Sequence, residues 1–168
     1  MNSFFSIWVP GVAIGVGDQF FKLVVTAEIP LLKRVPVLGQ NFLALTRVYN
    51  RGLMNDQLSD MPSGMIETYT RYLPTAIWLL LTGLAISQFK LSGRRARQGM
   101  IALLIGGASN LFDHYRIQYT IDTFQIYRSA TEHIPFNLAD LGILGGGSIW
   151  LYTILKDVMW PVGRPIRK

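Results

Sequence analysis

Three pairs of polar residues interrupt stretches that are otherwise apolar enough to lie in a membrane. The pairs are Asp18 and Lys22, Asn110 and Asp113, and Asn137 and Asp140. Residues three or four positions apart lie on one face of a helix, so each pair would give its helix a polar face. A helix cap or an internal salt bridge would explain any single pair, and a cap is expected at Asn137 in particular. Ionisable groups within membrane helices are costly, however, and are candidates for function.

The depth of the three pairs in the membrane favours a shared function. At a rise of ~1.5 Å per residue, Asp18 lies roughly 20 Å and Asn110 roughly 17 Å from the start of its helix. By the same rise, Asp140 lies roughly 30 Å from the opposite end of the last helix. All three pairs are therefore predicted at one level in the outer part of the membrane, so that three separate helices place polar groups at the same depth.

The composition indicates the elements that must position these residues. Hydrophobic residues make up 50% of the 168-residue chain and charged residues 15%, whereas a soluble domain usually carries about 25% charged residues. The sequence therefore predicts an all-α membrane protein, one domain over residues 1–168, with a small extracytoplasmic β-sheet (a cradle) over about 35–65. The four predicted transmembrane helices span about 4–29, 72–89, 98–114 and 138–160.

The first apolar stretch is predicted to be a retained transmembrane helix. It lacks the positively charged start of a cleaved signal peptide, and Asp18 and Lys22 interrupt its apolar run. Both features are atypical of a signal peptide.

Basic residues are distributed unevenly between the connecting segments. One side carries eight Lys and Arg residues against a single acid, Asp157; the eight are Lys90, Arg94, Arg95, Arg97, Lys156, Arg164, Arg167 and Lys168. Because cytoplasmic loops carry an excess of Lys and Arg, both termini are predicted to be cytoplasmic and residues 30–71 and 113–137 to face outward. This distribution also explains the net charge of +6, so no nucleic-acid partner is expected.

The polar blocks resemble the signature of the bacterial lipoprotein signal peptidase (signal peptidase II) family. "GGASNLFD", "TIDTF" and "FNLAD" are similar to its signature blocks, and "DQFFK" and "YNRG" occur in the order and spacing of that family. The resemblance implies that Asp122 and Asp140 are the catalytic pair, with Asp122 in a loop or at a helix end. It also implies binding or supporting roles for Asp18, Lys22, Asn50, Asn110, Asp113, His114 and Asn137.

The activity implied by the resemblance is that of a membrane-embedded aspartic endopeptidase. It would remove signal peptides from diacylglyceryl-modified prolipoproteins, cutting before the lipidated cysteine. Two carboxylates about 3 Å apart share one proton, so the ionised one can activate water while the protonated one polarises the scissile carbonyl. The chain has no cysteine, which excludes a thiolate nucleophile.

The resemblance also implies the setting and partners of the protein. The expected location is the bacterial inner membrane, with the active site near the outer leaflet. The expected partners are a lipid-modified prolipoprotein, membrane lipid and globomycin-like inhibitors. No metal or cofactor is expected, and the protein is expected to be a monomer.

Two other functions stay open on the sequence. A catalytically silent relative would bind lipidated peptides or lipopeptide antibiotics without cutting them. A small transporter or channel would use the outer polar cluster as an ion site. The presence of both Asp122 and Asp140 favours an active peptidase over the silent relative. The helix predicted over 72–89 contains no charged residue, which disfavours the transporter.

Two positions depart from the family pattern. His114 stands where the family usually has an arginine, and we hypothesise that it supports Asp113 or the substrate carbonyls. Asn50 is followed by "RGLMND", whereas the family usually has a run of small residues such as "GAAF". The segment 51–56 is therefore expected to hold the substrate in its own way.

Overall fold

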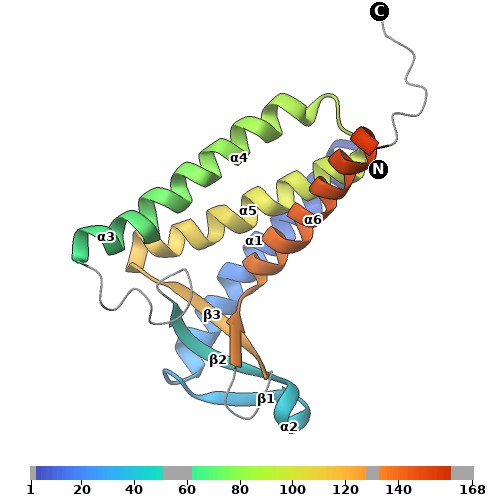
Figure 1. Ribbon diagram of the computed structural model, residues 1–168. Helices are drawn as coiled ribbons and strands as arrows, with labels where there is room; N and C mark the ends of the chain where they lie inside the picture. The colour runs from blue at the N-terminus through green and yellow to red at the C-terminus, as the bar shows by residue number, and fades with distance from the viewer. Residues whose placement is uncertain (1–2, 51–61, 128–132, 160–168) are drawn as a thin grey trace, which may run out of the picture.

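A bundle of long helices carries a small β-sheet at one end (Figure 1). The computed structural model describes residues 3–50, 62–127 and 133–159. The helices are α1 (Ser3–Glu28), α2 (Gly39–Phe42), α3 (Ser63–Glu67), the π-helical turn η1 (Thr68–Tyr72), α4 (Leu73–Phe89), α5 (Arg94–Ile117) and α6 (Leu138–Met159). The strands are β1 (Arg34–Leu38), β2 (Leu43–Asn50), β3 (Thr120–Tyr127) and β4 (His133–Phe136).

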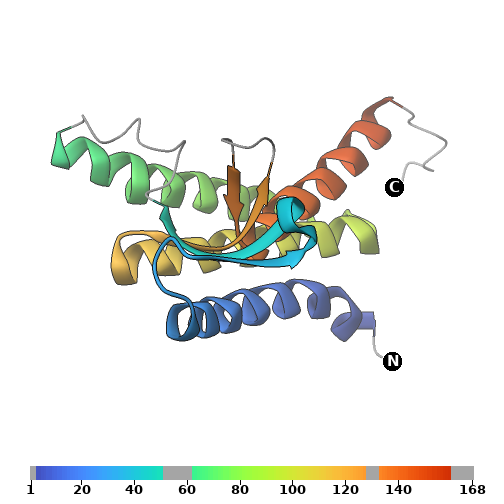
Figure 2. The same cartoon turned by 90° about the horizontal axis from the view of Figure 1, so that it is seen from below.

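Helix α5 forms the centre of the bundle. It packs against α1, α4 and α6, and Figure 2 shows it between α1 and α4. Its contact with α6 is a close backbone approach, because a Cβ atom added at Gly99 would lie 2.7 Å from the carbonyl oxygen of Gly146. Small residues permit such close packing between membrane helices.

Three helical spans among the described residues are long and apolar enough to cross a membrane. They are Phe5–Glu28, Gly64–Phe89 and Leu138–Asp157. The prediction of four transmembrane helices is therefore not confirmed, since α5 does not qualify. The reason is its composition: α5 begins with Arg94 and Arg95 and has Asp113 and His114 in its last turns. Ten of its residues are buried, among them Asp113 and His114, whereas Arg94 and Arg95 are exposed.

The helix predicted over 72–89 begins earlier than expected. α3, η1 and α4 follow one another without a break from Ser63 to Phe89. Glu67 and Arg71 lie within the outward connection predicted over 30–71, but in the structure they form an ion pair of 2.9 Å at i and i+4 of this helix. Such a pair is compatible with a helix that extends beyond the apolar segment.

The sheet is assembled from two separate parts of the chain. Its strands are antiparallel in the order β1-β2-β3-β4. The predicted cradle over 35–65 accounts for β1 and β2, while residues 51–61 lie outside the described part of the chain. β3 and β4 come from the second outward connection. The sheet is anchored to the bundle where Arg47 Nη1 donates a hydrogen bond to the carbonyl of Thr26 in α1, at 3.0 Å.

The turn from α5 into β3 determines where Asp122 lies. Gln118 adopts a left-handed conformation with φ of 68°, and its N–H donates to the carbonyl of His114. A left-handed residue at a helix end stops the helix and reverses the chain. β3 therefore turns back from the end of α5, and Asp122 belongs to a strand instead of the predicted loop or helix end.

Candidate active site

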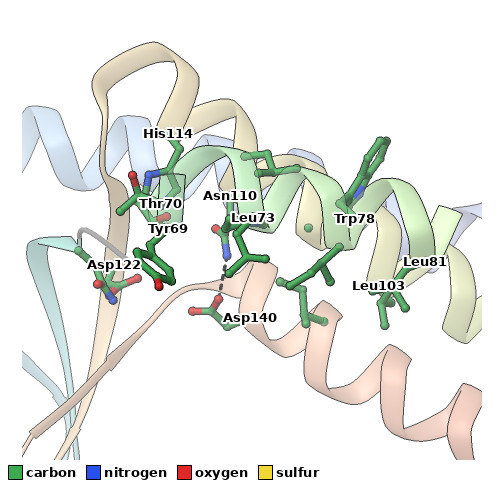
Figure 3. A pocket seen from close by; sticks show the side chains of 17 residues that line it. Tyr69, Thr70, Leu73, Trp78, Leu81, Leu103, Asn110, His114, Asp122 and Asp140 are labelled. Carbon is green, nitrogen blue, oxygen red and sulfur yellow. Dashed lines mark hydrogen bonds between the residues drawn. The ribbon is translucent and has the colours of Figure 1, made fainter. Parts of the chain in front are cut away.

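Two carboxylates from different elements line one pocket. Asp122 comes from β3 and Asp140 from the first turn of α6, and both line a cavity of about 410 Å³ (Figure 3). The side chain of Asp122 is buried, with 2% of its surface exposed, whereas Asp140 is half-buried. The pocket extends from the carboxylates along an apolar wall between α4 and α5.

Asn137 and Asp140 form a reciprocal cap at the start of α6. The backbone N–H of Asp140 donates to Oδ1 of Asn137 at 3.0 Å, and the N–H of Asn137 donates to Oδ2 of Asp140 at 2.9 Å. This arrangement satisfies two helix-end groups and fixes both side chains. Asn137 and Asp140 therefore cap helix α6 and also belong to the candidate site.

Asn137 is bonded to both carboxylates, to that of Asp122 through its side chain and to that of Asp140 through its backbone N–H. Its Nδ2 donates to Oδ1 of Asp122 at 3.1 Å and to Oδ1 of Asn110 at 3.1 Å. Nδ2 of Asn110 in turn donates to Oδ1 of Asp140 at 2.8 Å. Asn50 donates to the second oxygen of Asp122 at 3.0 Å. Each carboxylate is thus held by an asparagine, and Asn137 is bonded to both.

A buried ionic cluster lies behind the asparagines. Lys22 Nζ contacts Oδ2 of Asp18 at 2.5 Å and Oδ2 of Asp113 at 2.7 Å. It also donates to Oδ1 of Asn110 at 3.0 Å. Both carboxylates of the cluster are fully buried, and Lys22 is 2% exposed. The cluster therefore links α1 and α5 to the asparagine that contacts Asp140.

Asp18 also stabilises the start of α6. Its Oδ1 accepts the backbone N–H of Ala139 at 3.0 Å, and its Oδ2 accepts the hydroxyl of Ser109 at 2.8 Å. A carboxylate at a helix N-terminus pairs with free N–H groups and with the positive end of the helix dipole. Three helices thus meet at this one side chain.

The pKa of Asp122 is raised from 3.8 to about 7, chiefly because burial disfavours the charged form. This value already includes the lowering effect of the hydrogen bond from Asn50 and the raising effect of the negative charge of Asp140. A carboxyl group with such a pKa holds a proton at pH values where an exposed aspartate is ionised. The site is therefore suited to keeping one proton on a pair of carboxylates.

Eight of the nine site residues predicted from the sequence are hydrogen-bonded or ion-paired in one network. They are Asp18, Lys22, Asn50, Asn110, Asp113, Asp122, Asn137 and Asp140. His114 lies apart from this network: it lines the pocket and is 5% exposed, but its Nδ1 has no hydrogen-bond partner among the described residues. The hypothesis that His114 supports Asp113 stays a prediction. The segment 51–56 lies outside the described residues.

Several residues of the site were not identified from the sequence. Nε2 of Gln19 donates to the hydroxyl of Ser109 at 2.9 Å and to Oδ1 of Asp113 at 3.2 Å. Gln19 follows Asp18 and Ser109 precedes Asn110, and this adjacency to predicted site residues was the one indication in the sequence. Tyr69 lines the pocket from η1, and its place in a segment predicted as a loop gave no signal. The described part of the chain contains no group of three or more His, Cys, Asp or Glu side chains suited to a metal ion.

The apolar helices, with two carboxylates that line one pocket at the sheet end of the bundle, define a helical membrane protein with a paired-carboxylate site. The sequence model of "Signal peptidase (SPase) II" matches residues 11–156, and the chain belongs to this family. The resemblance seen in the motifs is therefore confirmed. Membership makes the protein a membrane protease of lipoprotein processing.

Curated relatives carry the same family name. The chain is 26% identical over 151 residues to a lipoprotein signal peptidase from Clostridium acetobutylicum, covering 87% of this chain and 92% of the relative. It is 30% identical over 142 residues to that of Sinorhizobium fredii, covering 84% and 81%. It is 31% identical over 144 residues to that of Xanthomonas axonopodis pv. citri, covering 83% and 80%.

Solved structures support the fold. A bacterial membrane enzyme determined by the in meso method at 2.3 Å resolution superimposes with a TM-score of 0.73 at 16% identity, covering 99% of this chain and 94% of its own. A second, determined at 1.9 Å resolution, gives a TM-score of 0.72 at 18% identity, covering 92% and 93%. At such identities the likeness concerns the fold alone.

Proposed function

We propose that this protein is an aspartic endopeptidase that removes signal peptides from diacylglyceryl-modified prolipoproteins, cutting before the lipidated cysteine. The observation that carries the proposal is that Asp122 and Asp140 line one pocket and are both bonded to Asn137. Peptide hydrolysis by two carboxylates needs this pairing of one proton donor and one base.

The environments of the two aspartates support different roles. Asp122 is the buried member with a pKa raised to about 7, so we assign it the shared proton and the polarisation of the scissile carbonyl. Asp140 is half-buried at the N-terminus of α6, where the helix dipole favours a negative charge. Ionised Asp140 would take a proton from the attacking water. Asn110 and Asn137 keep the carboxylates in place during this exchange.

The proposed setting is the bacterial inner membrane with α5 as a fourth crossing. Its 24 residues correspond to about 36 Å of helix, enough for a bilayer core of about 30 Å. The sheet end would face outward, so that the pocket opens near the outer leaflet. Water would reach the carboxylates there, while the acyl chains of the substrate stay in lipid. Globomycin-like inhibitors would compete for the same pocket, and the protein would act as a monomer.

The test is cleavage of a diacylglyceryl-modified prolipoprotein by the purified protein in detergent. We expect a cut before the lipidated cysteine. Asp122→Asn and Asp140→Asn should each lower kcat at least ~1,000-fold, because members of a catalytic unit fail together. Mass spectrometry of the products locates the cut.

The controls separate a peptidase from a silent relative. Thermal unfolding should show that both variants remain folded. If the wild-type protein binds the substrate and leaves it intact, the protein is a non-cleaving binder. If either variant keeps substantial turnover, that carboxylate has no part in the mechanism.

A further inference from the structure

Among the described residues that line the pocket, Tyr69 is the one tyrosine, and it belongs to none of the networks described above. It lines the same cavity as Asp122 and Asp140. Figure 3 shows its ring between the two carboxylates, with the phenol directed into that space. The side chain is 38% exposed, and its hydroxyl forms no hydrogen bond within the described residues. The hydroxyl of Tyr69 is therefore a hydrogen-bond donor directed at the place where a scissile bond would lie.

The element that carries Tyr69 is unusual. η1 is a π-helical turn that lies between the α-helices α3 and α4. Single π turns are rare within helices and occur frequently at functional sites, because the wider turn displaces the side chains that it carries. The turn here presents Tyr69 and Thr70 to the pocket.

Arg71 anchors this turn to the end of α5. Its Nε donates to the carbonyl of His114 at 3.2 Å, and its Nη1 pairs with Glu67 at 2.9 Å. The guanidinium also lies 5.8 Å from the ring centroid of Tyr115. Arg71 is not one of the described residues that line the pocket. Its contacts fix the position of η1 relative to the site without reaching the carboxylates.

We propose that Tyr69 is a catalytic residue that donates its phenol hydrogen bond to the oxygen of the scissile carbonyl as negative charge develops there, and that Arg71 positions it. The inference rests on the proposed function. The phenol O–H acts as a hydrogen-bond donor in this role and transfers no proton. A donor preset at a developing oxyanion stabilises the transition state more than the bound substrate.

The first test is Tyr69→Phe in the cleavage assay with the diacylglyceryl-modified prolipoprotein. We expect kcat to fall about 10- to 100-fold, the effect of losing one hydrogen bond to a charged group, with KM within about twofold of wild type. The apparent pKa values of the pH–rate profile should not move, because the carboxylate pair is unchanged. Tyr72→Phe is the matched control, since Tyr72 belongs to the same turn, is 57% exposed and does not line the pocket.

The second test asks whether Arg71 acts through Tyr69. Arg71→Gln should lower kcat in the wild-type background and have little further effect in the Tyr69→Phe background, because the two side chains act as one unit. Equal losses in both backgrounds would overturn the positioning role of Arg71.

The outcomes distinguish this inference from the function on which it rests. If the wild-type protein does not cleave, the proposed function fails and the inference fails with it. If the wild type cleaves and Tyr69→Phe keeps its kcat, or loses activity through KM alone, Tyr69 is only a wall of the pocket and the inference is overturned. A fall in kcat for Tyr72→Phe as large as that for Tyr69→Phe would overturn it as well.

Discussion

At the scale of single residues, neighbouring groups decide which way each amide of the site points. Lys22 can only donate, so Oδ1 of Asn110 must face it, and Nδ2 of Asn110 is left for Asp140. Asn137 is fixed in the same way, because its Oδ1 accepts the N–H of Asp140 and its Nδ2 faces Asp122. The buried ammonium group therefore orients a donor that contacts the carboxylate pair.

Replacing Lys22 by methionine tests this chain of contacts. Lys22→Met removes the cation between two fully buried carboxylates and leaves Oδ1 of Asn110 without that donor. We expect a loss of about 3–5 kcal/mol in the free energy of unfolding, as for other broken buried ion pairs, together with loss of cleavage. Denaturant unfolding in detergent measures the first effect. Stability within 1 kcal/mol of wild type would show that the cluster does not hold the helices together.

The proton on Asp122 predicts a pH dependence of stability. Its pKa in the folded protein, about 7, lies above the 3.8 of an unperturbed aspartate. Between these values the folded protein binds a proton that the unfolded chain releases, so stability falls as pH rises from about 4 to 7. Asp122→Asn cannot ionise and should lose this part of the dependence, becoming progressively more stable than wild type across the window.

Thermal unfolding of the two proteins in detergent at a series of pH values measures this difference. Because the two proteins differ only at position 122, the contributions of the other ionisable groups to the pH dependence cancel to first order. Unfolding midpoints that run parallel from about pH 4 to 7 would mean that Asp122 does not retain its proton in the folded protein.

At the scale of elements, the contact between α5 and α6 helps to place the two aspartates at one pocket. α5 leads into β3 and Asp122, while α6 begins with Asp140. The two helices touch through glycines: a Cβ atom at Gly146 would lie 2.5 Å from the carbonyl oxygen of Gly99 and 2.7 Å from the nitrogen of Leu103. Any side chain at Gly146 would push the helices apart and disturb the site at their outer end.

Two adjacent glycines provide a matched test of this contact. Gly146→Ala should destabilise the protein by about 1–3 kcal/mol, the usual cost of overpacking, and lower its activity. Gly145→Ala should be neutral or slightly stabilising, because a Cβ atom there meets nothing within 4 Å and alanine favours helix. Thermal unfolding and cleavage assays of both variants compare them. Equal effects at both positions would contradict the close approach of α5 and α6.

At the scale of the whole molecule, the sheet and the basic connections lie at opposite ends. Figure 1 shows the start of α1, the end of α6 and the connection between α4 and α5 together, away from the sheet. That connection and the first turn of α5 contain Lys90, Arg94 and Arg95. The positive-inside rule would place this end in the cytoplasm and the carboxylate pair at the outer side.

Reporter fusions test this orientation. We expect a reporter that works only in the cytoplasm to be active when it is joined to the C-terminus, because the end of α6 lies on the same side as the basic connection. A reporter inserted after Leu38, at the sheet end, should show the opposite behaviour. Activity of an exported reporter at the C-terminus would reverse the topology and place the carboxylate pair at the cytoplasmic face.

The sequence alone determined the class of the protein and indicated most residues of the candidate site. Apolar stretches of helical length fix the membrane setting. The spacing within a helix is constant, so the pair of Asp18 and Lys22, or of Asn110 and Asp113, had to share a face wherever its helix lay. The motifs indicated the family, because they contain the aspartates and asparagines of its signature blocks.

Only the tertiary structure decided which of these faces meet, and how. Asp18 bonds the N–H of Ala139, 121 positions away, and no local spacing specifies such a contact. Asp122 lies in a strand because its segment pairs with β2, a long-range partner. The buried Asp113 of α5 is tolerated because it pairs with Lys22 of α1, and the turn that carries Tyr69 is bonded to the end of α5 through Arg71. Helical spacing is a local property of the backbone, whereas burial and contact depend on segments that the chain brings together only when it folds.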